Sequence, residues 1–198
     1  MKRTNAPEDG FQPYTGTAIL LHWLLALLLL GSFCVGAYMA DLKLSPERIR
    51  LFNYHKWAGI TILLLSALRL AWRLTHRPPP EPATLKARDI VIALWTHRLL
   101  YVLFFAVPIA GWAYSSASGF PVVWFGKIPL PDLVARDKGL ADILVEVHGT
   151  LAWTLGALVV LHAAAAIKHQ LFDKDLVLAR MLPAGARARI LARREARR

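Results

Sequence analysis

Four histidines occur at positions that fit metal coordination inside a membrane. His148 and His162 lie fourteen residues apart in one long apolar segment, so a helix would place them about 40° apart in azimuth and about 21 Å apart along its axis. His22 and His55 each lie near one end of an earlier apolar segment. Because a buried histidine in lipid is costly without a strong partner, these residues predict a coordinated metal.

The depths of these histidines divide them into two pairs. His22 and His162, here called the inner pair, lie near one membrane face, and His55 and His148, the outer pair, lie near the other. Zinc favours three or four ligands in one cluster, whereas two imidazoles on facing helices suit a six-coordinate iron porphyrin. We therefore expect two haems with irons about 20 Å apart. A zinc site, a proton relay and plain helix packing are the alternatives.

The cysteine content indicates how these haems would be held. Cys34 is the single cysteine, and the sequence contains no CxxCH motif. Covalent c-type attachment is therefore excluded, and the haems would be bound non-covalently.

Four apolar segments are long enough to carry the histidines across a membrane. The chain has 198 residues, of which 56% are hydrophobic, and each segment can span a hydrocarbon core of about 30 Å. The segments are residues 17–40, 51–74, 90–114 and 140–168. We predict an all-α integral membrane fold, a four-transmembrane-helix bundle holding two b haems in a single domain (residues 1–183), followed by a basic tail (residues 184–198).

The distribution of basic residues indicates the orientation in the membrane. Of the 24 lysines and arginines, 17 belong to the side that carries both termini and 7 to the other side. The positive-inside rule then places both termini of this multi-pass membrane protein in the cytoplasm. The formal net charge of +11 thus reflects membrane asymmetry, and nucleic acid is not an expected partner because no soluble domain is large enough to bind it.

Several residues near the inner pair have the chemistry to bind a haem propionate or a quinone. Arg69 and Arg73 lie four residues apart on one predicted helix face, and Arg98 is near them in depth. Arginine pairs well with carboxylates, and snorkelling to lipid phosphate is the alternative. His97 is expected either to contact a propionate or quinone carbonyl or to be an ordinary interfacial residue, and His169 is the natural rival for the inner iron.

Basic residues near the outer pair favour an anionic substrate. Lys56 follows His55 directly, and Arg48 and Arg50 precede it by a few positions. Cations beside a haem edge would attract a small anion such as superoxide, and we assign this anion steering to Lys56 and Arg50. An ordinary interfacial role for these side chains is the alternative.

Motifs along nearly the whole chain, from about Tyr14 to Pro183, resemble those of the bacterial cytochrome b561 family. This family is related to the cytochrome b subunits of nickel–iron hydrogenases and formate dehydrogenases. The order and spacing of the motifs carry the resemblance, since any one of them alone would be weak. The motifs are LLHW (20–23), HKWAG (55–59), RLAWR (69–73), THRLLY (96–101), VPIAGW (107–112), VHGTLAW (147–153), LHAAAAIKH (161–169) and ARMLP (179–183).

The resemblance implies both a ligand set and an activity. The haem-ligating histidines of the family fall on His22, His55, His148 and His162, and the family fold is a four-helix, di-haem b protein that moves electrons within the membrane. Standalone members are quinone-coupled carriers, and at least some of them oxidise superoxide and pass its electron to ubiquinone.

The expected function is therefore that of a membrane di-haem b cytochrome of the superoxide:ubiquinone oxidoreductase (superoxide oxidase) type. Its partners would be membrane lipid, a quinone, and superoxide or another small donor, with a soluble redox protein as a further option. One alternative is an electron-relay cytochrome b subunit serving a separate dehydrogenase or hydrogenase. A second alternative is a non-haem proton or metal carrier. The sequence assigns no catalytic residue and does not locate the quinone pocket.

Overall fold

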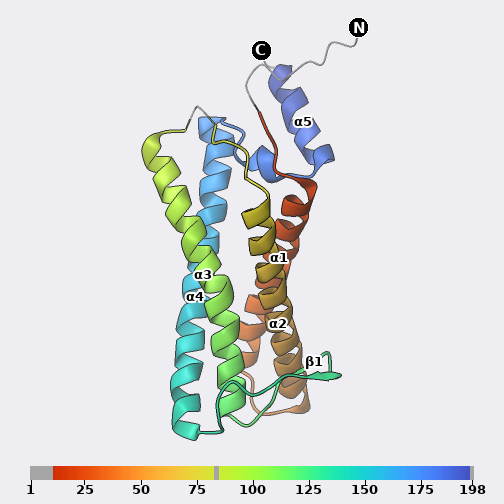
Figure 1. Ribbon diagram of the computed structural model, residues 1–198, viewed down its shortest axis with the longest axis vertical. Helices are drawn as coiled ribbons and strands as arrows, with labels where there is room; N and C mark the ends of the chain where they lie inside the picture. The colour runs from red at the N-terminus through yellow and green to blue at the C-terminus, as the bar shows by residue number, and fades with distance from the viewer. Residues whose placement is uncertain (1–10, 83–84, 197–198) are drawn as a thin grey trace.

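The computed structural model describes residues 11–82 and 85–196, which form four long helices, a small hairpin and a short terminal helix (Figure 1). The long helices are α1 (Gly16–Ala40), α2 (Pro46–Thr75), α3 (Ala87–Ala117) and α4 (Lys138–Lys168). The shorter elements are β1 (Val123–Trp124), β2 (Ile128–Pro129), the π-helix η1 (His169–Asp173), the 3-10 helix η2 (Leu178–Met181) and α5 (Ala184–Glu195). The first ten residues of the predicted domain and the last two of the predicted tail lie outside the described residues.

The four long helices confirm the predicted four-helix membrane fold, and each is long and apolar enough to cross a membrane. The structure differs most at the start of α2, which begins at Pro46 and not at residue 51. The Ser45 side chain accepts a hydrogen bond from the backbone N–H of Arg48, and proline is favoured at the first helical position. These local signals extend the helix by more than a turn beyond its apolar part.

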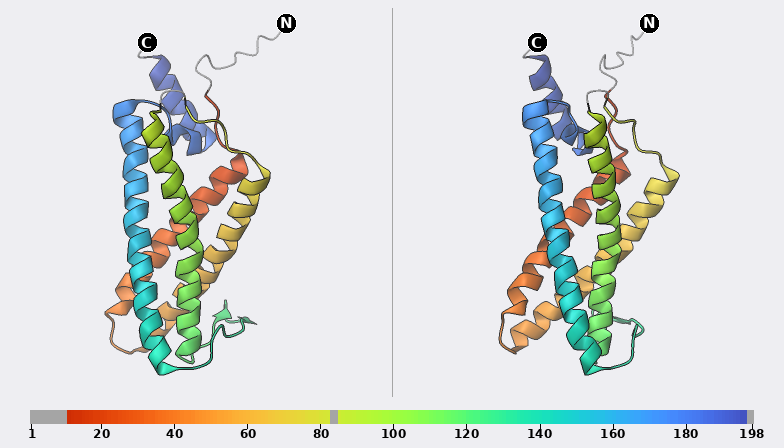
Figure 2. Two further views of the ribbon diagram at one scale, coloured as in Figure 1. Left: turned by 60° about the vertical axis from the view of Figure 1, so that its left-hand side comes forward. Right: turned by 90° about the vertical axis from the view of Figure 1, so that its left-hand side faces the viewer.

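The helices pack as two antiparallel pairs. α1 packs against α2 and α3 packs against α4, while α2 and α3 join the two pairs (Figures 1 and 2). A small buried core of Leu100, Leu103 and Leu155 lies between α3 and α4. Over the described residues, the backbone of α4 makes no comparably close packing against α1 or α2. Side chains therefore bridge α4 to the first two helices.

The outer surface of the bundle is apolar. Large hydrophobic side chains are exposed on all four helices, including Leu27, Leu64, Trp95 and Val160, whose exposed fractions are 66%, 51%, 62% and 67%. A soluble monomer rarely exposes so much contiguous apolar surface. This surface is therefore suited to face lipid hydrocarbon.

The two ends of the bundle differ in their connections. α1 begins and α4 ends at the same end, here called the termini end, and α5 lies beyond it (Figure 1). The opposite end, here called the hairpin end, carries the long connection between α3 and α4, which includes β1 and β2. This connection is tied to α2, because Trp57 Nε1 donates to the Val123 carbonyl at 2.7 Å and Trp124 Nε1 donates to Thr61 Oγ1 at 3.2 Å.

Candidate haem-binding sites

The outer histidine pair faces across the bundle near the hairpin end. The ring centroids of His55 on α2 and His148 on α4 lie 6.0 Å apart, with an angle of 85° between the ring planes. His55 Nδ1 lies 3.0 Å from the Ser32 carbonyl oxygen, and His148 Nδ1 lies 3.0 Å from the Val107 carbonyl oxygen. A carbonyl only accepts, so each Nδ1 must be the donor, and each Nε2 keeps a lone pair for a metal.

Two glycines allow these rings to lie against the neighbouring helices. Gly36 follows Ser32 by four residues on α1, and a Cβ atom at Gly36 would lie 3.0 Å from Cε1 of His55. Gly111 has the same relation to Val107 on α3, where a Cβ atom would lie 2.9 Å from Cε1 of His148. The two helix pairs thus hold the two histidines in the same way. Neither glycine was singled out from the sequence, because their role depends on which helix faces which.

The inner pair meets near the termini end. The ring centroids of His22 on α1 and His162 on α4 lie 6.3 Å apart, with an angle of 68° between the ring planes. His97 on α3 joins them, with its ring centroid 5.3 Å from that of His162. The structure therefore brings three imidazoles together at this depth, where the sequence predicted two ligands.

The separations of the two predicted pairs fit imidazoles on opposite sides of one iron. With a nitrogen–metal bond of about 2 Å and a ring centre about 1 Å further out, two such rings would have centroids about 6 Å apart. The values of 6.0 Å for His55–His148 and 6.3 Å for His22–His162 match this distance. The 5.3 Å between His97 and His162 is shorter, which fits a neighbour of the ligand better than a partner across the iron.

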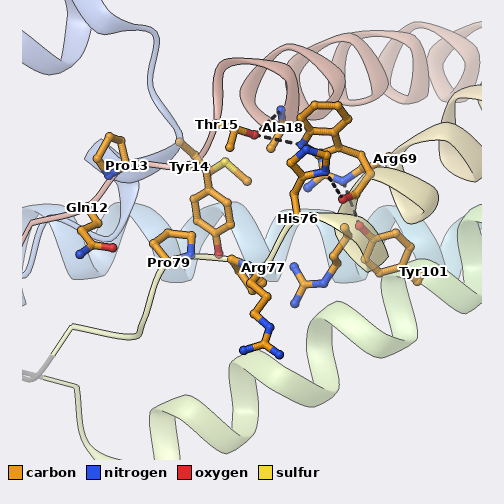
Figure 3. Close-up of a pocket in the computed structure, with 14 residues that line it drawn as sticks. Gln12, Pro13, Tyr14, Thr15, Ala18, Arg69, His76, Arg77, Pro79 and Tyr101 are labelled. Carbon is orange, nitrogen blue, oxygen red and sulfur yellow. Dashed lines mark hydrogen bonds between the residues drawn. The ribbon is translucent and has the colours of Figure 1, made fainter.

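A cationic cavity of about 190 Å³ lies at the termini end (Figure 3), and its lining includes Ala18, which is about one helical turn before His22 of the inner pair on α1. Arg69 and Arg73 on α2 and Arg77, two residues beyond its end, line it, and no acidic side chain of the described residues is among its lining residues. Arg69 Nε donates to the Tyr101 hydroxyl of α3 at 3.3 Å. Such a wall of guanidinium groups suits a carboxylate or phosphate.

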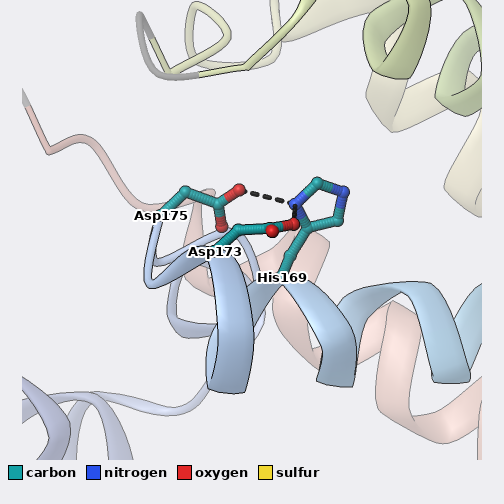
Figure 4. Close-up of side chains that lie close together, drawn as sticks. All are labelled: His169, Asp173 and Asp175. Carbon is teal, nitrogen blue, oxygen red and sulfur yellow. Dashed lines mark hydrogen bonds and ion pairs between the residues drawn. The ribbon is translucent and has the colours of Figure 1, made fainter.

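The remaining inner candidates have other contacts. The Arg98 guanidinium lies 5.0 Å from the centre of the Trp95 ring and does not line the cavity. His169, in η1, lies with Nδ1 2.6 Å from Asp175 and 3.0 Å from Asp173 (Figure 4). The imidazole of His169 is therefore held by carboxylates at the end of α4.

The two residues predicted to steer anions differ in their surroundings. Lys56 is half-buried, and its Nζ donates to the carbonyls of Phe120 and Pro121 at 3.4 and 3.2 Å. Arg50 is exposed on the first turns of α2. Lys56 thus clamps the connection between α3 and α4 in addition to carrying a charge, whereas Arg50 has its guanidinium open to solution.

Four membrane-spanning helices with histidines facing one another across the bundle place the chain in the class of membrane b-type cytochromes. Residues 13–184 match the family model described as prokaryotic cytochrome b561, and the chain belongs to that family. Its members are membrane electron-transfer proteins that bind b haem.

Three curated relatives support this assignment. "Cytochrome b561 homolog 2" of Escherichia coli (strain K12) is 33% identical over 189 residues, which cover 92% of this chain and 95% of the relative. "Probable superoxide oxidase CybB" of Yersinia pestis is 31% identical over 178 residues, covering 86% and 96%. "Cytochrome b561 homolog 1" of Escherichia coli (strain K12) is 28% identical over 178 residues, covering 86% and 97%.

Proposed function

We propose that this protein is a di-haem cytochrome b of the bacterial inner membrane that oxidises superoxide and reduces ubiquinone. His22 and His162 would hold the inner haem, and His55 and His148 the outer haem. The facing of the two histidine pairs at 6.3 and 6.0 Å is the observation that carries the proposal. The relative named "Probable superoxide oxidase CybB" supports the choice of superoxide as electron donor.

The residues around the outer pair hold its two imidazoles in a form suited to bind haem iron. When bound, a haem with two imidazole ligands supplies reversible one-electron exchange and leaves no iron position open to substrate. The carbonyls of Ser32 and Val107 fix the tautomer of His55 and His148 and raise the basicity of their Nε2 atoms. Rings already held in this way lose little freedom on binding iron.

The two ends of the bundle would serve the two half-reactions. Two superoxide anions each give up one electron and become dioxygen, and ubiquinone takes both electrons and two protons to become ubiquinol. Arg50 and Lys56 at the hairpin end would attract the anion. At the termini end, Arg69 and Arg73 would contact a propionate of the inner haem or a quinone carbonyl. The charge asymmetry of the chain supports placing this end in the cytoplasm.

Rapid mixing of the purified protein with superoxide, with and without a short-chain ubiquinone, tests the proposal. We expect superoxide to reduce a b-type absorption band and to disappear catalytically only when ubiquinone is present. A b-type band that superoxide does not reduce would contradict superoxide oxidation and favour the relay subunit. Absence of any b-type band from protein made with sufficient haem would contradict the whole proposal.

A further inference from the structure

One buried guanidinium nitrogen near the outer pair lacks a partner. Nε of Arg48, in the first turn of α2, is buried and has no hydrogen-bond partner among the described residues. No carboxylate of the described residues forms an ion pair with Arg48 either. Buried polar groups are almost always hydrogen-bonded, and a charged donor without an acceptor is costly. The orphaned donor therefore points to an acceptor that the chain itself does not supply.

The position of Arg48 relates it to the outer pair. Arg48 precedes His55 by seven residues, so it lies within about 20° of the same helix face and about 10 Å closer to the helix start. Its guanidinium carbon lies 5.4 Å from the centre of the Phe52 ring. Phe52 lies between Arg48 and His55 along this face. The guanidinium of Arg48 thus packs beside a ring that lies one turn closer to His55 on the same helix.

Neighbouring cations do not share this arrangement. Arg50 is two residues further along α2, about 200° around the helix from Arg48, and is exposed. Lys56 already donates to two carbonyl oxygens of the connection between α3 and α4. Among these three basic residues, Arg48 alone combines a buried unpaired donor with the helix face of His55.

We propose that Arg48 binds a propionate carboxylate of the outer haem, an inference that rests on the proposed function. A haem held by His55 and His148 carries two propionates on one edge, and a guanidinium matches the planar carboxylate through two parallel N–H donors. The Phe52 ring supports the guanidinium from one side. Arg48 would anchor the outer haem and, through its positive charge, favour the reduced state of that haem.

The test compares Arg48→Gln with Arg50→Gln, which makes the same change of charge two residues away. Haem content is measured by the pyridine haemochrome assay, haem loss by transfer to excess apomyoglobin, and the potential of each haem by redox titration. We expect Arg48→Gln to speed loss of one haem about tenfold or more, the value for one hydrogen bond to a charged group. We also expect it to lower the potential of that haem, whereas Arg50→Gln leaves haem loss unchanged.

A third variant distinguishes a specific loss of haem contacts from misfolding. Arg48→Lys keeps the charge but loses the paired donors, so we expect two haems, a potential near that of the wild type and haem loss of intermediate rate. Identical haem loss and potentials in Arg48→Gln, Arg50→Gln and wild type would overturn the inference. Wild-type protein that binds fewer than two haems would instead overturn the proposed function, which makes the two failures distinguishable.

Discussion

Individual backbone atoms, as much as side chains, shape the outer histidine pair. His55 and His148 each donate to a carbonyl of the preceding helix and press against a glycine four residues beyond that carbonyl. Residue types alone were enough to select the histidines as candidate ligands, because a polar group in an apolar segment is conspicuous. They did not predict Gly36 or Gly111, since a glycine in a membrane helix has many other uses.

We expect Gly36→Ala to weaken the outer site. The added methyl group would lie 3.0 Å from Cε1 and 3.4 Å from Nδ1 of His55, so the ring would shift and its bond to the Ser32 carbonyl would lengthen. The haem content of purified protein should fall toward one per chain. Gly31→Ala is the control, because Gly31 is exposed on the same helix and a Cβ there meets nothing within 4 Å. Two fully retained haems in Gly36→Ala would argue against this packing role.

The roles of the three imidazoles at the inner site can be tested separately by substitution. If His22 and His162 hold the iron, replacing either with alanine should remove the inner haem and leave the outer one. His97→Ala should keep both haems, because its ring is a neighbour of His162 at 5.3 Å and not its counterpart across the iron. Haem content and the low-spin electron paramagnetic resonance signals of the three variants measure this. Loss of the inner haem from His97→Ala with retention in His22→Ala would reverse the assignment.

The sequence predicted the helices whose extent depends on hydropathy. It did not predict the features that depend on particular contacts between residues. The four spans follow from the length of the apolar segments, and His148 and His162 both lie on α4. The early start of α2 depends on the Ser45 cap, which apolar periodicity does not reveal. The hairpin of β1 and β2 has strands of two residues each, too short to show any alternation, and side chains of α2 hold it.

We expect Lys56→Gln to loosen the connection between α3 and α4. The change removes the ammonium group that donates to the carbonyls of Phe120 and Pro121. Hydrogen–deuterium exchange across residues 118–137 should speed up about tenfold, since a hydrogen bond to a charged group contributes about 1.5 kcal/mol or more. Lys127→Gln, an exposed change in the same connection, should have little effect. Equal exchange in wild type and Lys56→Gln would show that the clamp contributes nothing to the order of this segment.

Across the whole molecule, the uneven distribution of charge is the feature most relevant to function. The sequence predicted an excess of basic residues on the side of the termini, and the fold places the start of α1 and the end of α4 together there (Figure 2). The hairpin end, at which the outer pair lies, carries fewer cations. Their effect on an anionic donor depends on long-range attraction, which salt weakens.

Replacement of Arg50 by glutamate should slow the reaction with superoxide. The guanidinium of Arg50 is exposed, so the change reverses a charge without removing the carbonyl contacts that Lys56 makes. We expect the second-order rate constant to fall severalfold at low ionic strength and the difference to shrink at about 1 M salt, where the screening length is about 3 Å. A rate that is independent of both the substitution and the salt would contradict electrostatic steering of superoxide by Arg50.

A haem count joined to spectroscopy tests most directly whether four imidazoles hold two irons at two depths of one bundle. Purified full-length protein should contain two non-covalent b haems per chain, both low-spin with two histidine ligands, as measured by pyridine haemochrome analysis and electron paramagnetic resonance. One haem per chain, or a high-spin iron with an open coordination position, would contradict it.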